Sequence, residues 1–188
     1  MDEEDDAGER ILDAAAELIA RGGVHGLRIA ELARAAGVSR PTIYRRWGSS
    51  EEIVRAVLLQ RILAIGARVG FGAASRADLA EAVVAFTELV NADALFQRLL
   101  ERDPQVFITY AFQRIGRSQR YILGRLAAAI EAGQRDGSVR EGRPEEIAVM
   151  VFLVAQSAVL SHATVADLID PAAWRRELRR SVEGMLRP

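Results

Sequence analysis

The residues of this chain that could do chemistry are mostly arginines, and five of them cluster near the N-terminus. Between residues 28 and 46, five arginines stand against one acid, Glu31, so this segment carries 5 − 1 = +4, although the whole chain has a formal net charge of −1. Local charge governs attraction to phosphate, so the cluster indicates binding to a nucleic acid. The five are Arg28, Arg34, Arg40, Arg45 and Arg46.

Catalytic and metal-binding groups are scarce by comparison. The chain has no cysteine and two histidines, His25 and His162. A disulfide, a thiolate zinc site and a cysteine nucleophile are therefore excluded, and two histidines are too few for a histidine-built metal site. The sequence also lacks a Gly-x-Ser-x-Gly elbow and a paired catalytic motif. We therefore expect no enzyme activity, no metal and no cofactor.

The arginine cluster lies within a pattern typical of a helix-turn-helix between residues 28 and 47. Ala33 is the small residue that two steeply crossed helices need at their contact, and Gly37 suits a turn with positive φ. Ser39 is a favoured N-cap for the second helix, and Pro41 falls in its first turn. An amphipathic helix predicted over residues 8–21 precedes the motif and completes a three-helix unit.

The second helix of the motif has an outward face suited to reading the major groove. At about 100° per residue, Arg45, Thr42 and Pro41 point outward, where an arginine fork can bind guanine and the others can approach bases. Tyr44 and Arg46 flank the core side and suit phosphate oxygens, as does the hydroxyl of Ser39. Arg40 lies nearer the core side by angle, so its partner stays open.

The stretch from Ala36 to Trp47, followed by Gly48 to Glu52, resembles the signature of TetR-family transcriptional regulators. Two positions depart from that pattern: Arg28 stands where a hydroxyl residue usually opens the first helix of the motif, and Ser50 where a lysine is common. We expect Arg28 to replace the missing phosphate contact. The candidate DNA-binding residues are Arg28, Ser39, Arg40, Pro41, Thr42, Tyr44, Arg45, Arg46 and Ser50.

Helical spacing continues through the rest of the chain, and strand-like alternation of useful length is absent, so we predict an all-α fold of about nine helices. Residues 1–7 are expected to form a disordered acidic tail, residues 8–52 the helix-turn-helix DNA-binding domain, and residues 53–188 an effector-binding and dimerisation domain. The later helices are predicted over residues 49–65, 77–91, 94–102, 104–132, 144–164 and 171–186.

The last two predicted helices are the candidates for pairing two copies of the chain. Between Ile147 and Leu160, apolar residues surround the helix almost completely, so this helix must be buried on more than one side. The final helix carries an apolar stripe, and we interpret its arginines, from Arg175 to Arg180, as a solvated face. The family resemblance likewise implies a four-helix dimer interface, so we expect a homodimer that pairs two recognition helices on palindromic double-stranded DNA.

The resemblance also implies a ligand pocket in the C-terminal domain. An apolar-lined cavity with few polar groups would suit a small hydrophobic or aromatic effector. A constitutive DNA-binding protein without an effector would share the same DNA-reading head, and it stays open as the alternative. The candidate effector-binding residues are Phe86, Phe107, Tyr110, Gln113, Phe152 and Gln156.

The chain shows no feature of export or membrane insertion. Its N-terminus lacks a basic region followed by an apolar stretch, which a secretory signal would need. The most apolar segment, Ile147 to Val159, would span about 20 Å as a helix, against about 30 Å for the core of a bilayer. We therefore expect a cytoplasmic protein with no membrane association.

Overall fold

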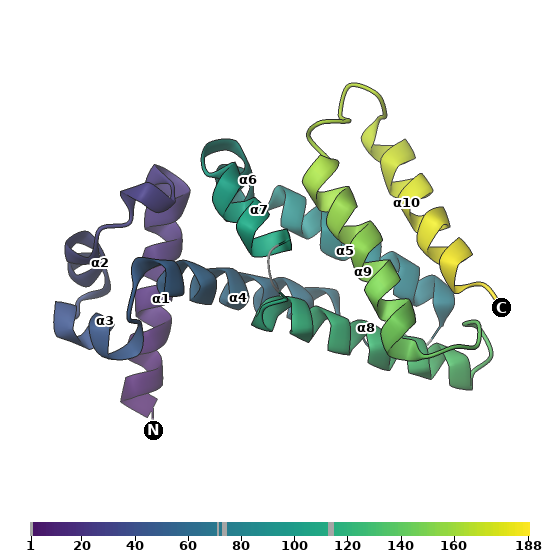
Figure 1. Ribbon diagram of the computed structural model, residues 1–188, viewed down its shortest axis with the longest axis horizontal. Coiled ribbons are helices and arrows are strands. Elements are labelled where there is room, and N and C mark those ends of the chain that lie inside the picture. Colours follow the sequence, from purple (N-terminus) through teal and green to yellow (C-terminus); the bar gives the residue numbers. More distant parts are fainter. Residues whose placement is uncertain (1, 71, 73–74, 113–114) are drawn as a thin grey trace. The chain divides into compact units, whose positions relative to one another are not determined.

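The computed structural model describes residues 2–70, 72, 75–112 and 115–188, and within them the fold is all-helical, as predicted (Figure 1). These residues form ten α-helices and one 3₁₀ helix. They group into two compact units, one of Met1–Ile62 with Asp93–Arg114 and the other of Leu63–Ala92 with Ile115–Pro188. Two later helices, within residues 93–114, therefore belong to the same unit as the helix-turn-helix. The domain boundary expected after residue 52 would separate them from it.

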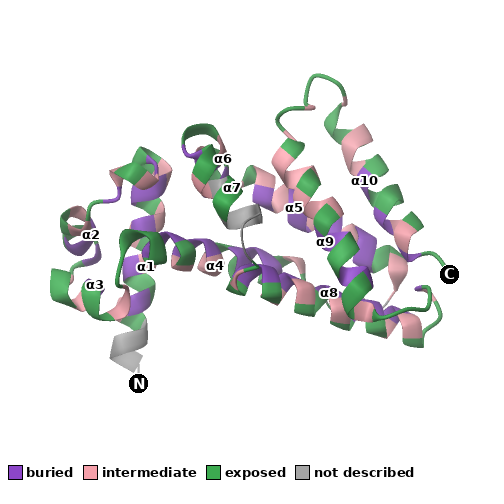
Figure 2. Cartoon of the chain, in the orientation of Figure 1, coloured by how far each residue is buried: buried purple, intermediate pink, exposed green. Residues whose placement is uncertain are grey.

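The first unit is built around α1 (Asp2–Gly22), which packs against α2 (Ile29–Ala36), the 3₁₀ helix η1 (Val24–Gly26) and α6 (Ala94–Arg102). It also holds α3 (Arg40–Arg46), α7 (Pro104–Phe112) and most of α4 (Ser50–Val69). Figure 2 shows buried positions recurring along α1. Fully buried apolar side chains from five helices form the core of this unit: Ile11, Ile19, Leu32, Ile43, Ile53, Phe96 and Leu99.

Helix α1 begins at Asp2, where the sequence predicted a disordered tail and a helix start at Gly8. Near the start of the helix Asp6 forms an ion pair with Arg10 one turn later, a spacing that stabilises helices.

In the second unit, α9 (Pro144–Ser161) packs against α5 (Arg76–Ala92), α8 (Arg117–Arg135) and α10 (Pro171–Leu186). Helix α5 also contacts α8 and α10, so it is buried over most of its length. By length and composition alone, α9 is long and apolar enough to cross a membrane, a test that core helices of soluble proteins also pass. Its Ile147, Val151 and Phe152 are buried within this unit.

One sequence prediction for these helices was wrong. The single helix predicted over residues 104–132 is two helices, α7 and α8, because Gly116 is extended (φ −85°, ψ −170°) and caps α8. Gln119 Oε1 accepts the Gly116 N–H at 3.0 Å and closes this cap. Of the arginines on α10, Arg176, Arg179 and Arg180 are exposed. Arg175 is half-buried and forms ion pairs with Glu81 and Glu88 of α5, which the sequence did not predict.

Candidate nucleic-acid interface

The turn between α2 and α3 has the geometry that the sequence predicted. Gly37 ends α2 in the left-handed region (φ 66°, ψ 33°). Its N–H bonds to the Arg34 carbonyl at 3.3 Å, and the next N–H, of Val38, bonds to the Ala33 carbonyl at 2.9 Å. Ala33 is buried at the contact, as expected for a small residue between two crossed helices. The chain thus reverses within three residues and presents α3 directly after α2.

Ser39 caps the N-terminus of α3, as predicted. It has extended backbone angles (φ −79°, ψ 152°), and its Oγ accepts the Thr42 N–H at 3.3 Å. The two hydroxyl oxygens also lie 2.8 Å apart, within hydrogen-bond distance. Thr42 is half-buried, so the cap fixes both hydroxyls at the start of the helix. Pro41 stands in the first turn and is exposed.

The outer face of α3 is exposed and cationic. Ile43 is fully buried and anchors the helix, whereas Arg45 is exposed and Tyr44 keeps 56% of its surface accessible. Arg40, which the helical angle placed nearer the core, is also exposed. It is the first residue of the helix, where the chain has only begun to wind around the axis. The result is a short arginine- and tyrosine-bearing surface that can approach DNA phosphates and bases.

Arg46 differs from its neighbours because it packs against α1. It is half-buried, and a Cβ atom at Gly8 of α1 would lie 2.7 Å from its Nη1 atom. Sequence reasoning missed this contact. Glycine inside a helix costs about 1 kcal/mol relative to alanine, and at Gly8 the absence of a side chain leaves room for Arg46, whereas the helical Gly124 and Gly184 have no neighbour within 4 Å.

Arg28 and Ser50 lie at two other helix N-termini of the same unit. Arg28 is the exposed N-cap of α2, and its carbonyl accepts the N–H groups of Glu31 and Leu32 at 3.0 and 2.9 Å. Ser50 is the exposed first residue of α4. The preceding Ser49 accepts the N–H of Glu52 at 3.2 Å, the first half of a capping box. Helix N-termini of this kind can donate to phosphate oxygens.

The second half of that box forms one residue earlier than in a standard capping box. Glu52 Oε2 accepts the N–H of Gly48 at 2.8 Å instead of that of Ser49. This bond secures the connection between α3 and α4. The helix-turn-helix and the start of α4 are therefore held by local hydrogen bonds at each of their turns.

The six candidate effector residues are distributed over both units. Phe86 of α5 and Phe152 of α9 are buried in the second unit, and Gln156 of α9 is half-buried there. Phe107 and Tyr110 belong to α7 of the first unit, and their side chains lie outside the described part of the structure. Gln113 lies outside the described residues altogether.

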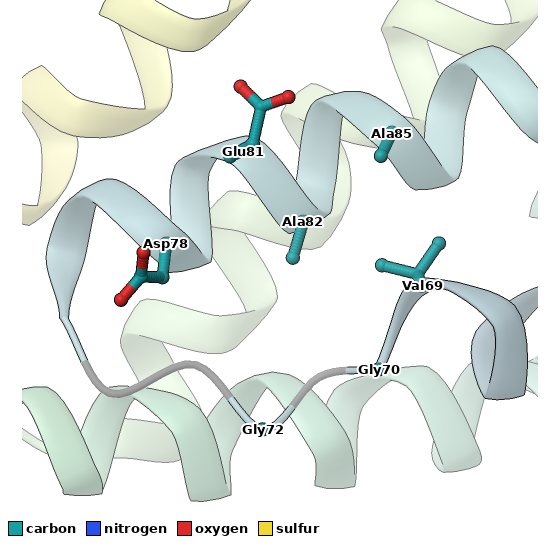
Figure 3. Close-up of a pocket in the computed structure, with 7 residues that line it drawn as sticks. All are labelled: Val69, Gly70, Gly72, Asp78, Glu81, Ala82 and Ala85. Carbon is teal, nitrogen blue, oxygen red and sulfur yellow. The ribbon is translucent and has the colours of Figure 1, made fainter.

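A hollow of about 340 Å³ opens in the second unit between the end of α4 and the start of α5 (Figure 3). Phe86, Phe152 and Gln156, the candidate effector residues whose side chains the structure describes, do not line it. Its two acids are already engaged, since Asp78 accepts from Ser75 at the N-terminus of α5 and Glu81 pairs with Arg175. The figure shows the Glu81 carboxylate on the opposite side of α5 from the Ala82 methyl group. This hollow therefore offers an effector little polar recognition. The residues that line it are Val69, Gly70, Gly72, Asp78, Glu81, Ala82 and Ala85.

Helix α9 carries a second apolar face besides the one buried in its own unit. Val149, Met150 and Leu153 keep 42%, 51% and 48% of their surfaces accessible. Neighbouring exposed apolar side chains on one side of a helix are typical of a surface that another protein covers. Within the described residues, no group of three His, Asp or Glu side chains could hold a metal ion.

Comparisons with a protein-family model and with curated proteins agree, the first over part of the chain and the second over nearly all of it. Residues 11–57 match the model of bacterial regulatory proteins of the tetR family. Over 182 residues the chain is 38% identical to an HTH-type transcriptional regulator of Mycobacterium bovis, covering 96% of this chain and 95% of that protein. An HTH-type transcriptional regulator of Mycobacterium tuberculosis H37Rv is 37% identical with the same coverage.

Solved structures share the fold at low sequence identity. The R. erythropolis transcriptional repressor QsdR from the TetR family superposes with a TM-score of 0.72 at 18% identity, covering 97% of this chain and 95% of QsdR. The transcriptional regulator FadR of Bacillus subtilis, solved in complex with stearoyl-CoA, gives a TM-score of 0.63 at 20% identity, covering 95% and 99%. The similarity extends over both units of the chain.

Proposed function

This chain is a member of the TetR family of bacterial transcriptional regulators, and we propose that it binds a palindromic operator as a homodimer and releases it on binding a small hydrophobic effector. As a member of this family it is a DNA-binding regulator and not an enzyme. The observation that carries the proposal is the exposed, arginine-bearing outer face of α3, held by Ser39 and the Gly37 turn. We assign DNA reading to residues 8–52, effector binding and dimerisation to residues 53–188, and the site of action to the cytoplasm.

Base reading falls to the exposed side of α3. Arg45 can bind the O6 and N7 atoms of guanine with two parallel N–H groups, and Pro41 and Thr42 can contact neighbouring bases, including a thymine methyl group. Their place at and beyond the first turn of a helix with a buried Ile43 supports this role, because the helix then has one fixed orientation. Arg40 adds positive charge beside them.

Backbone anchoring falls to residues around the same surface. Tyr44 is exposed beside Arg45, and Ser39 lies at the helix N-terminus, where phosphate oxygens bind favourably. Arg28 and Ser50 mark the N-termini of α2 and α4. Arg46, which lies against Gly8 of α1, is assigned to the same role.

Dimerisation is assigned to α9 and α10. The exposed Val149, Met150 and Leu153 of α9 support it, since a second copy would remove them from water. A two-fold dimer would place its recognition helices about 34–36 Å apart, the separation of successive major grooves. The operator would then be a palindrome with matching half-site spacing.

Effector binding is assigned to the second unit, near Phe86, Phe152 and Gln156. Two aromatic side chains and one amide favour a hydrophobic or aromatic ligand. Since FadR of Bacillus subtilis holds stearoyl-CoA in a related fold, long acyl compounds belong in the first panel beside aromatic ones. A thermal-shift screen of the full-length protein tests this assignment. Stabilising compounds that also lower operator affinity support it, whereas stabilisers that leave operator affinity unchanged favour a constitutive DNA-binding protein.

The DNA-binding proposal is tested by selecting bound oligonucleotides from a random pool and then measuring variants on the selected site. Arg45→Ala should weaken operator binding by about 1–3 kcal/mol and relax the preference at one base pair per half-site. Arg125→Ala, which removes the same charge from the exposed surface of α8, is the matched control and should leave the preference intact. Selected sites without two-fold symmetry would contradict the dimeric operator, and an equal loss on every sequence would move Arg45 to the backbone anchors.

A further inference from the structure

Asp103, at the C-terminal end of α6, lies against the chain reversal that leads from α1 into the helix-turn-helix. We propose that it is a positioning residue for DNA reading, which holds α2 and α3 at the angle that α3 needs in the groove. This inference rests on the proposed role of α3. It places a residue outside residues 8–52 within the DNA-reading machinery.

The contact joins segments far apart in the sequence. Asp103 Oδ2 accepts the N–H of Val24 at 2.8 Å, across 79 residues. Val24 is the first residue of η1, the short 3₁₀ helix between α1 and α2. Asp103 keeps only 6% of its surface accessible. A buried carboxylate is costly unless it accepts hydrogen bonds, so the position is an unusual one for an acid with no role.

Gly23 provides a second, independent observation at the same place. Its φ is 74°, in the left-handed region, and a Cβ atom on it would lie 2.6 Å from Asp103 Oδ2. Two requirements therefore meet at this residue: a backbone conformation that favours glycine, and the close approach of a carboxylate that leaves no room for a side chain. The backbone of the reversal at Gly23 therefore accommodates the Asp103 carboxylate.

Two further contacts extend this junction on both sides. On α6, Arg98 Nε donates to the carbonyl of Ala20, in the last turn of α1, at 3.1 Å. Beyond Val24, the Nε2 atom of the exposed His25 lies 3.7 Å from Asp103 Oδ1. The end of α6 thus holds the chain at Ala20 and at Val24, immediately before and after the reversal.

The carboxylate is not needed to end α6. The backbone N–H of Asp103 bonds to the Leu99 carbonyl at 3.0 Å, and its own carbonyl accepts from Val106 at 2.9 Å. Any residue can supply these backbone bonds. The side chain serves η1 instead, and from Val24 only three residues lead to Arg28, the N-cap of α2. A change in the direction of η1 would therefore change the direction of α2 and, through the Gly37 turn, that of α3.

The test compares Asp103→Ala and Asp103→Asn with wild type in the full-length protein, at a temperature well below the melting point of each. The measured quantities are the Kd for the selected operator, the Kd for unrelated DNA at the same salt concentration, and hydrogen exchange of the Val24 amide. Asp136→Ala is the matched control, because it removes a carboxylate that accepts a backbone N–H, of Ser138 at 2.7 Å, from the second unit.

For Asp103→Ala we expect operator binding to weaken about tenfold, the ratio that corresponds to about 1.4 kcal/mol, with a much smaller change on unrelated DNA. The Val24 amide should exchange faster than in wild type. Asp103→Asn keeps a carbonyl oxygen at the same place, so it should restore most of the operator affinity and of the protection. Asp136→Ala should keep the wild-type ratio of the two Kd values.

A wild-type Kd ratio in Asp103→Ala, with only a lower melting temperature, would overturn the proposal and leave Asp103 a purely stabilising residue. If Asp103→Ala does not fold, Asp103→Asn is the deciding variant. A loss of operator affinity in Asp103→Asn without faster exchange of the Val24 amide would then contradict the proposal. Failure of the operator proposal is recognised separately. In that case the wild-type protein itself selects no palindromic site, whatever the variants do.

Discussion

Replacing Gly37 by alanine isolates the cost of one backbone conformation in the helix-turn-helix. Gly37 has a φ of 66°, and a Cβ atom built on it meets no heavy atom within 4 Å. No clash or cavity therefore enters the free energy of unfolding. An L-residue in the left-handed region costs about 1–2 kcal/mol, and alanine recovers about 0.4–1 kcal/mol by restricting the unfolded chain. We expect Gly37→Ala to lower the stability of the first unit by about 1 kcal/mol.

Two substitutions calibrate this value. Gly26→Ala is the matched control, because Gly26 also has no neighbour within 4 Å of its Cβ position but is not among the residues with positive φ. Only the unfolded-state effect applies there, so Gly26→Ala should stabilise the same unit by about 0.4–1 kcal/mol. Gly37→Asn should fall between Gly37→Ala and wild type, since asparagine tolerates the left-handed region better than alanine does.

The assay uses the two tryptophans, which lie in different units. Trp47 follows α3 in the first unit, and Trp174 belongs to α10 in the second. In a Trp174→Phe background, the tryptophan fluorescence followed during urea unfolding comes from Trp47 in the first unit alone. Protein concentration is held fixed, because association changes apparent stability. If Gly37→Ala and Gly26→Ala shift the unfolding midpoint in the same direction, the argument from φ is refuted.

Three further changes test other parts of the structure. Ser39→Ala removes the side-chain cap of α3 and should cost about 1 kcal/mol in the same Trp47 assay; an unchanged midpoint would contradict the cap. Gly133→Ala would place a Cβ atom 2.5 Å from Val139 Cγ2 at a buried position of α8, so it should cost about 1–3 kcal/mol in calorimetry. Adding Val139→Ala to that variant should recover part of the loss. Hydrogen bonds from the Ser138 side chain and backbone hold the pKa of Asp136 below its ordinary value of 3.8. The stabilisation by Asp136 is therefore present above pH 3.8 and is lost as the pH falls through the lower, folded-state pKa, so the difference in Tm between wild type and Asp136→Asn should shrink in acid.

The local parts of the reading head could be predicted because each depends on neighbours in the sequence. A positive φ at Gly37 and the cap at Ser39 follow from residue types whose conformational preferences act over three or four positions. The buried Ile43 and exposed Arg45 follow from the helical period. The same short-range rules predicted a dimerising apolar surface on α9, and they failed where one long helix was predicted across Gly116.

Long-range contacts were beyond these rules. Nothing near Asp103 indicates that its carboxylate meets Val24, and nothing near Arg175 indicates that its partners are Glu81 and Glu88. Periodicity shows which face of a helix is buried, but it does not show which element covers that face. The division of the chain into units depends on such contacts, so α6 and α7 could not be grouped with the helix-turn-helix from the sequence.

Two glycines lie where a distant side chain approaches the backbone. Gly8 lies inside a helix and Gly23 at its end, and each has a side chain from elsewhere in the sequence within 3 Å of its Cβ position. Gly124 and Gly184 also lie within helices but have no neighbour within 4 Å, and Gly37 is explained by φ alone. A glycine therefore permits a close approach without predicting one. Both partners, Arg46 and Asp103, are among the residues that we propose for reading DNA. A substitution of Gly8 or Gly23 should therefore displace the partner side chain or weaken DNA binding.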